Sequence, residues 1–154
     1  MTLTKRCFAL LALSAAFTLP ALAQERGTKE EATALVKAGV EHIKKVGAAQ
    51  AYKDFTEDKA NWTKKDLYVM VYDAKNVGLA HGANKAIVGR DMGAVKDANG
   101  VAIVVDMNKI AASKGKGWLD YDWPHPQTKK IEPKSTYVEK LPSGEGFIGV
   151  GVYR

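Results

Sequence analysis

The sequence has few of the residues that mark several common kinds of functional site. Its single cysteine, Cys7, lies near the start of a chain of 154 residues. A disulfide, a thiolate metal site or a cysteine nucleophile is therefore not expected in the rest of the chain. Nothing resembles a nucleophile elbow, a phosphate loop or a His-Glu-x-x-His site, so we do not expect an enzyme.

Ligands for a metal or a cofactor are also scarce. The three histidines, His42, His81 and His125, lack any spacing typical of a metal site. We therefore expect no metal and no cofactor. A metal or haem site built from His81 and His125 is a minor alternative that the sequence alone leaves open.

Positive charge is present but not concentrated. The net charge of +6 is spread along the chain in pairs such as Lys44-Lys45, Lys64-Lys65 and Lys129-Lys130. A nucleic-acid-binding surface is usually more clustered, so we expect no nucleic acid partner. The small positive excess still favours an anionic small molecule.

The first 23 residues have the three parts of a secretory signal peptide. Lys5 and Arg6 form a basic start, residues 8–19 an apolar run, and Ala21-Leu22-Ala23 a small-residue exit. We expect cleavage before Gln24 and a periplasmic or secreted domain over residues 24–154 that does not span the membrane. An uncleaved anchor is the alternative, but its apolar run would have to reach about 18 residues.

Residues 28–47 predict an amphipathic helix. Thr28 followed by Glu31 fits a capping box, and Gly47 suits the end of the helix. A second, shorter helix is expected over residues 48–58. The apolar residues of the first helix recur every three or four positions and form one stripe, Ala32, Leu35, Val36, Val40, Ile43 and Val46.

After residue 63 the apolar period changes to two, which is typical of strands. The first strand has aliphatic residues on one face, and Met70 and Tyr72 belong to its other face. Asn76 suits a left-handed turn, a long loop over residues 82–98 is expected to cover one face, and a helix follows over residues 101–113. Strands are expected over residues 67–72, 77–81, 115–123, 135–141 and 147–153.

These elements predict an α+β fold, a five-stranded antiparallel sheet with helices on its aliphatic face. On the other face of the last strand, Gly149 and Gly151 stand between Phe147 and Tyr153. Glycine in a strand often marks a close approach of a ligand or of the backbone. We expect the two glycines to shape a pocket with aromatic walls; the alternative is that another residue fills the gap.

The stretch from Tyr121 to Tyr137 combines aromatic residues with three of the five prolines of the chain, a histidine and a lysine that is a candidate for burial, Lys134. A loop expected over residues 124–133 interrupts two strands there. Binding groups are often carried by loops that a rigid scaffold positions. We expect this stretch to cover and line a small-molecule pocket.

With these elements placed, residues 65–153 resemble the single Cache domain family, type 2, a PAS-like extracytoplasmic sensor module. The resemblance is carried by several ordered motifs: Tyr72-Asp73, Leu79-Ala80-His81, Val88-Gly89, Lys96-Asp97-Ala98-Asn99-Gly100, Tyr121-Asp122-Trp123-Pro124-His125-Pro126, Pro133-Lys134-Ser135-Thr136-Tyr137 and Gly149-Val150-Gly151-Val152-Tyr153. It implies a PAS-like sheet with the N-terminal helices on one face and a loop-covered ligand pocket on the other. It also implies a role in sensing, chemotaxis or signal transduction.

Two local departures from the family pattern concern turns. The family often has glycine where this chain has Asn76, and proline where it has Gly82. The first departure is harmless because asparagine adopts the same turn. The second is expected to loosen the loop after His81. Most members of the family that it resembles are tethered by two membrane helices. We expect this chain to lack them and to be a stand-alone binder that acts through an unidentified partner.

The resemblance implies a pocket for a small organic acid or a similar metabolite. An acid needs a cation and donors for its carboxylate and an apolar wall for its tail. Lys134 would supply the charge, His81 and the tyrosines the hydrogen bonds, and Trp123 the wall. The predicted ligand-binding residues are Tyr72, His81, Tyr121, Trp123, Lys134 and Tyr137, with Met70, Gly149 and Gly151 shaping the pocket.

Lys134 and Tyr137 are three residues apart and would point to opposite faces of a regular strand. Both reach the pocket only if Lys134 precedes the strand or if a bulge lies between them. The alternative function is a protein-interaction adaptor for a membrane sensor or complex, without a small ligand. A membrane sensor, a transporter or a second copy in a homodimer remain open as partners.

Overall fold

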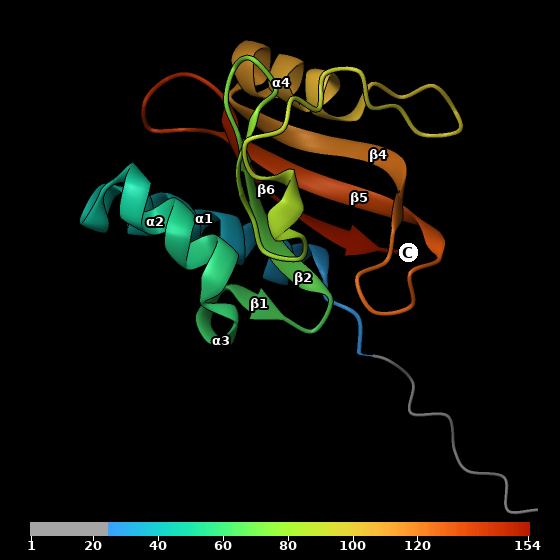
Figure 1. Ribbon diagram of the computed structural model, residues 1–154, viewed down its shortest axis with the longest axis horizontal. Helices are drawn as coiled ribbons and strands as arrows, with labels where there is room; N and C mark the ends of the chain where they lie inside the picture. The colour runs from blue at the N-terminus through green and yellow to red at the C-terminus, as the bar shows by residue number, and fades with distance from the viewer. Residues whose placement is uncertain (1–24) are drawn as a thin grey trace, which may run out of the picture.

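The computed structural model describes residues 25–154, so the predicted signal peptide lies outside the described residues. One antiparallel sheet forms the middle of the domain, with helices on both of its faces (Figure 1). The elements in chain order are α1 (Lys29–Val46), α2 (Ala48–Glu57), α3 (Lys59–Trp62), β1 (Thr63–Lys64), β2 (Leu67–Tyr72), β3 (Gly78–His81), the 3-10 helix η1 (Lys85–Ile87), α4 (Ile103–Lys114), β4 (Lys116–Pro124), β5 (Ile131–Lys140) and β6 (Phe147–Tyr153).

The five predicted strands form a single sheet in the order β3-β2-β6-β5-β4, and the short β1 adds a further pairing to β2. Strands β4, β5 and β6 are joined as a meander, and β6 then pairs antiparallel with β2. The last strand of the chain therefore lies in the centre of the sheet. This confirms the predicted α+β class and its antiparallel sheet.

The N-terminal helices cover one face of the sheet. Thr28 and Glu31 form the predicted capping box, and Gly47 ends α1 with a positive φ of 84°. The aliphatic side chains of β2 and β6 alternate with the aromatic ones, so only the aliphatic set faces these helices. Together they make a core from Val36, Val40, Phe55, Leu67, Val69, Val71, Ile148, Val150 and Val152.

The other face of the sheet is covered by α4 and by the chain between β3 and α4. Ile87 of η1 and Val104 and Met107 of α4 are buried there. Figure 1 shows α4 and the N-terminal helices on opposite sides of the sheet. The expectation that the helices lie on the aliphatic face is therefore wrong for α4. Its apolar stripe packs against the aromatic face of the sheet. The side chains of the sheet that are buried on this face are Tyr68, Met70, Tyr72, Tyr121, Phe147 and Tyr153.

Strand β5 begins at Ile131, four residues before the predicted start, and the loop that connects it to β4 is correspondingly shorter. Pro133 lies within the strand opposite Asp122. Proline removes one backbone donor, but the Pro133 carbonyl still accepts a hydrogen bond from the Arg154 N–H at 2.9 Å. The strand therefore continues through the proline and includes Lys134.

Within residues 25–154, no helix combines the length and the hydropathy that crossing a bilayer needs. The same residues hold no group of three or more His, Cys, Asp or Glu side chains placed to bind a metal ion.

Candidate functional site

A small cavity, called here the inner cavity, lies between the aromatic face of the sheet and the layer that contains α4. Of the predicted site residues, Tyr72, His81, Tyr121, Trp123 and Met70 line it. Its free space is about 10 Å³, measured as the room open to the centre of a water molecule, which is enough for roughly one water. The remaining walls are apolar and come from the covering layer, Met92, Val95, Ile103, Val104 and Met107.

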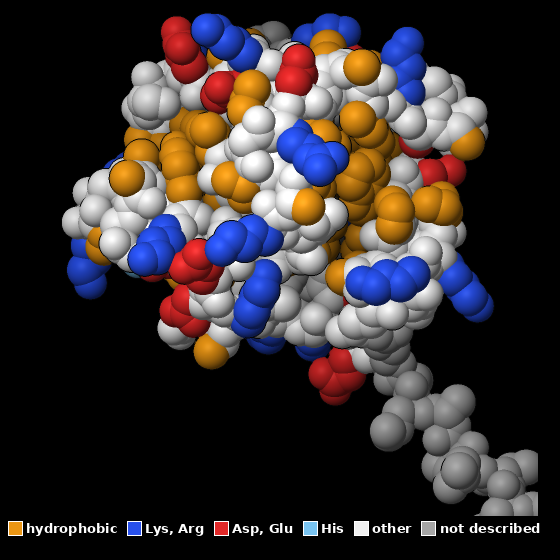
Figure 2. All heavy atoms as spheres, in the orientation of Figure 1, with side chains coloured by type: hydrophobic (Ala, Val, Ile, Leu, Met, Phe, Trp, Pro, Cys, Tyr) orange, Lys and Arg blue, Asp and Glu red, His pale blue; other side chains and the backbone are white. Residues whose placement is uncertain are grey.

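A larger hollow lies next to this cavity and opens to the surface. It has a volume of about 370 Å³, and its walls include Tyr68, His125 and Lys129. His81 and Trp123 line both spaces, so these two side chains form the wall between the inner cavity and the outer hollow. Figure 2 shows hydrophobic side chains gathered on this side of the molecule, between the segment that carries η1 and strand β4.

Lys134 is fully buried on the same face. Its ammonium donates a hydrogen bond to the Tyr68 hydroxyl at 2.6 Å and lies 4.2 Å and 4.7 Å from the ring centres of Tyr68 and Tyr153. Burial lowers the pKa of Lys134 to about 7, and the negative charge of Asp66 offsets part of this effect. No carboxylate of residues 25–154 forms an ion pair with Lys134. The positive charge is instead stabilised mainly by the faces of the Tyr68 and Tyr153 rings.

Gly151 makes the position of Lys134 possible. Strand β6 lies between β5, which carries Lys134, and β2, which carries Tyr68. A Cβ atom on Gly151 would overlap Lys134 Cε and would lie 2.5 Å from Thr136 Oγ1. The lysine side chain therefore occupies most of the space beside Gly151 and crosses the central strand β6. Gly151 does not line the inner cavity, and Gly149 does not line it either. A Cβ atom on Gly149 would lie 3.2 Å from side-chain atoms of Thr136 and Val138.

His81 is held in one orientation by its own loop. Its Nδ1 accepts hydrogen bonds from the N–H groups of Ala83 and Asn84 at 3.3 and 3.0 Å. An accepting Nδ1 places the proton of a neutral ring on Nε2. Burial, with smaller contributions from Lys134 and Lys59, lowers the pKa of His81 to about 3, so the ring is neutral at ordinary pH. Its Nε2–H makes no hydrogen bond within residues 25–154.

The tyrosine hydroxyls supply the other polar groups of the site. The Tyr121 hydroxyl lies 2.8 Å from Thr136 Oγ1, and burial raises the pKa of Tyr121 and of Tyr72. These hydroxyls therefore stay protonated and able to donate. In the pairing of β4 with β5, Tyr121 lies directly opposite Lys134, which joins the lysine to the wall of the inner cavity.

Tyr137 does not join the other predicted residues. Its ring lies 5.3 Å from that of Trp118 and belongs to the core on the helix face. Lys134 and Tyr137 both lie inside β5, and the pairing of β5 with its two neighbours runs without a bulge between them. The condition under which both would face the pocket is therefore not met, and the placement of Tyr137 in the pocket is wrong.

A buried polar cluster beside Lys134 was missed by the sequence analysis. The Tyr153 hydroxyl lies 3.4 Å from that of Tyr68 and donates to the Pro124 carbonyl at 2.9 Å. Asp66, 1% exposed, accepts the Gly27 N–H at 2.7 Å and lies 3.6 Å from His125 Nε2. The strand alternation already placed both tyrosines on this face, but Asp66 lies in a tight turn, where no periodic pattern indicates burial.

Comparison with known proteins agrees with this geometry. The chain matches the family described as Single Cache domain 2 over residues 21–154. It is 28% identical over 88 residues to the methyl-accepting chemotaxis protein McpP of Pseudomonas putida, an alignment that covers 57% of this chain and 16% of that receptor. The chain thus spans about a sixth of the length of this curated relative.

Solved structures show the same fold. The crystal structure of a methyl-accepting chemotaxis protein from Vibrio parahaemolyticus superposes with a TM-score of 0.69 and 28% identity, covering 81% of this chain and 87% of that one. A Cache chemosensory domain, solved for the structural basis of its carboxylic acid recognition, gives a TM-score of 0.68 and 24% identity, with coverages of 80% and 91%. The chain belongs to the Single Cache domain 2 family of extracytoplasmic sensor domains.

Proposed function

We propose that this domain binds a small organic acid on the aromatic face of the sheet and acts as a periplasmic sensor through a partner protein. The observation that carries the proposal is Lys134, a fully buried lysine without an ion pair in residues 25–154. An ammonium has three donors, and Lys134 uses one of them, toward Tyr68. A buried charge is costly unless it is paired, so an anion placed here is strongly favoured.

The groups on the wall of the inner cavity suit a carboxylate with a short apolar tail. His81 offers a fixed Nε2–H, and Tyr72 and Tyr121 offer hydroxyls on the wall of the inner cavity. Three methionines, Met70, Met92 and Met107, form much of the apolar wall. Methionine side chains adapt readily to irregular shapes, so the small cavity can enlarge around a ligand without loss of apolar contact. The recognition of a carboxylic acid by a Cache domain of the same fold supports the proposal.

The inner cavity has room for only about one water, and this observation favours the second candidate function. That candidate is an adaptor that docks on a membrane sensor and has no small ligand of its own. Ligand binding distinguishes the two functions, because a specific ligand stabilises the folded state and an adaptor without a ligand is not stabilised.

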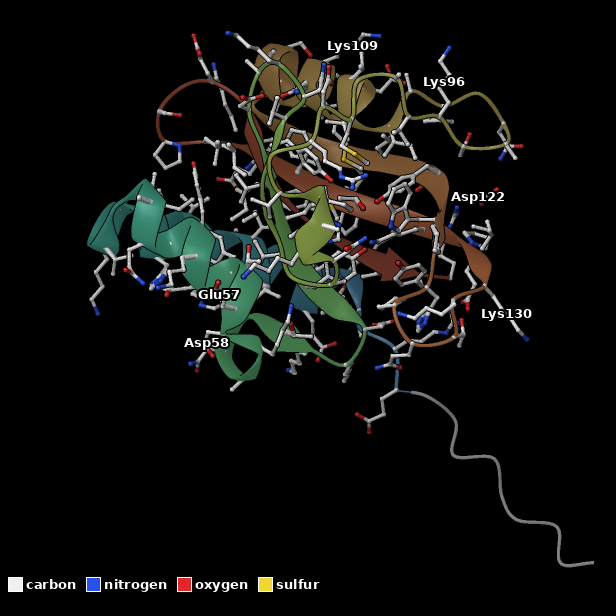
Figure 3. All side chains as sticks on the ribbon, in the orientation of Figure 1. Glu57, Asp58, Lys96, Lys109, Asp122 and Lys130 are labelled. Atoms are coloured by element: carbon white, nitrogen blue, oxygen red, sulfur yellow. The ribbon has the colours of Figure 1, made fainter. Side chains whose placement is uncertain are left out.

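The test is a thermal-shift titration with acetate, propionate, butyrate and succinate. At 100 times the dissociation constant, a ligand stabilises the native state by about 2.7 kcal/mol and raises Tm by several degrees. Lys134→Met should abolish this rise and leave the fold intact. Lys130→Met is the matched control, since Lys130 projects from the β4–β5 loop away from the domain (Figure 3). If no acid raises the Tm of the unmodified protein, the binding proposal is contradicted and the adaptor is supported.

A further inference from the structure

His81 lies at the end of an edge strand. It ends β3, which pairs with β2 and, through Gly78, forms a bridge to Val88 of the long segment that follows it and leads to α4. Its Nδ1 is oriented by the N–H groups of Ala83 and Asn84, which belong to that segment. The direction of the free Nε2–H therefore depends on whatever holds residues 82–85 in place.

The helix layer on the opposite face of the sheet makes three contacts to this segment. Thr56 of α2 accepts the His81 N–H with its Oγ1 at 3.2 Å, in a buried contact. Lys59 of α3 donates a hydrogen bond from its ammonium to the Gly82 carbonyl. Glu57 forms an ion pair with Lys85 at 3.0 Å, and Figure 3 shows Glu57 on the helix layer beside the sheet.

Gly82 is consequently fixed at both of its backbone groups. Its N–H donates to the Val69 carbonyl at 2.8 Å, and its own carbonyl accepts from Lys59. A Cβ atom at this position would lie 3.0 Å from Tyr68 Cβ and 3.2 Å from the Phe55 carbonyl, so little room is left for a side chain. The expectation that Gly82 loosens the loop after His81 is wrong, because the helix layer and β2 hold it.

We propose that Thr56 and Lys59 are positioning residues that hold His81 in the orientation it needs to donate its Nε2–H to the ligand. The proposal rests on the organic-acid site proposed above. Neither residue lines the inner cavity. Thr56 holds the His81 N–H and Lys59 holds the Gly82 carbonyl, so both act through the backbone next to the His81 side chain. The helix layer thus takes part in a site on the other face of the sheet, through the edge strand β3.

The experiment compares four variants with one control. Thr56→Val removes the hydroxyl with almost no change in shape, and Thr56→Ser retains it. Lys59→Met removes the donor, and Lys59→Arg keeps a positive donor. Lys53→Met, an exposed lysine on α2 without a side-chain hydrogen bond or ion pair within residues 25–154, is the control. Calorimetric titration with propionate and nitrogen-15 spectra of the histidine rings are recorded for each protein.

We expect Thr56→Val and Lys59→Met each to weaken propionate binding by about fivefold to tenfold, because each breaks one hydrogen bond to the His81 segment. Their His81 spectra should shift from the pure Nε2–H tautomer toward a mixture of tautomers. Thr56→Ser, Lys59→Arg and Lys53→Met should keep both the affinity and the tautomer of the unmodified protein. This rescue separates positioning from a general loss of stability.

The two readouts distinguish the possible failures. If the unmodified protein does not bind propionate, the organic-acid proposal loses this support, and the spectra alone decide the role of Thr56 and Lys59. An unchanged His81 tautomer in both Thr56→Val and Lys59→Met overturns the positioning role. Unchanged propionate affinity in both variants, with a binding wild type, overturns it as well.

Discussion

Lys134 and Tyr137 lie three residues apart on β5 and point to opposite faces of the sheet. The lysine ammonium contacts the Tyr68 and Tyr153 rings, whereas the Tyr137 ring contacts Trp118 on the helix face. The motif that contains both residues therefore serves two layers of the domain. Its first half contributes a buried cation to the candidate site, and its second half contributes an aromatic ring to the core under α1.

This difference in facing predicts opposite outcomes for two tyrosine-to-phenylalanine changes. Tyr121→Phe removes a hydroxyl from the wall of the inner cavity and should weaken acid binding by about threefold to tenfold, the value of one hydrogen bond. Tyr137→Phe should leave binding unchanged, because its hydroxyl contacts only Glu139 at 3.5 Å. Calorimetric titration of both variants checks this. Weaker binding in Tyr137→Phe alone would contradict the assignment of faces.

Most of the fold could be predicted from the sequence because periodicity reports burial directly. The alternation of aliphatic and aromatic residues in β2 and β6 assigned their side chains to the correct faces, and the capping box located the start of α1. The elements α3 and β1 were missed, since four and two residues are too few to show a period. The position of α4 on the aromatic face could not be derived, because an apolar stripe does not specify which surface it meets.

The sequence analysis named five residues that line the inner cavity, Met70, Tyr72, His81, Tyr121 and Trp123, but it did not predict how the site is arranged. The bare Gly151 was recognised as unusual, but its occupant, the Lys134 side chain, depends on the order β5-β6-β2 in the sheet. The pairing of Lys134 with Tyr68 likewise joins residues 66 positions apart. Such contacts follow from strand order, which short-range patterns do not determine.

The buried lysine predicts how stability changes with pH. The pKa of Lys134 falls to about 7 in the folded state, against an ordinary 10.5. Between these two values the unfolded chain binds more protons than the folded one, so the free energy of unfolding rises with pH. Lys134→Met should remove this rise, on the order of a few kcal/mol, and should be more stable than the wild type at pH 6. Urea unfolding at pH 6, 7.5 and 9 measures it; equal pH slopes in the two proteins would refute it.

The same lysine predicts the pH dependence of acid binding. Below about pH 7 Lys134 is charged, whereas His81 stays neutral down to about pH 3. Affinity should therefore be nearly constant between pH 5.5 and 6.5 and should decline as pH rises through 7 and above. A bound carboxylate raises the pKa of the lysine, so the decline in affinity begins near the pKa of the free protein and continues up to the higher pKa of the complex. Titration calorimetry with propionate across pH 5.5–9 tests this, and an affinity that rises with pH would exclude Lys134 as the anion-binding group.

Gly151 gives the most direct test of the path that Lys134 takes across the sheet. Gly151→Ala places a methyl group where the Lys134 side chain now lies, so the ammonium should leave Tyr68. We expect a loss of about 1–3 kcal/mol in stability and at least a tenfold loss in acid affinity. Gly149→Ala is the matched control on the same strand, since its nearest neighbours lie at 3.2 Å and a small adjustment suffices.

A double-mutant cycle then identifies the cause of the Gly151→Ala effect. If the added methyl group acts by displacing Lys134, the part of its cost that comes from the lysine should disappear in a Lys134→Ala background, whereas the close approach to Thr136 Oγ1 at 2.5 Å remains. The coupling energy should therefore be clearly favourable but smaller than the single-mutant cost, and urea unfolding of the four proteins measures it. Additive effects would show that the methyl group acts through Thr136 or through the sheet itself. In that case the glycine would be required by Thr136 or by the backbone of β6, and not by the lysine that crosses it.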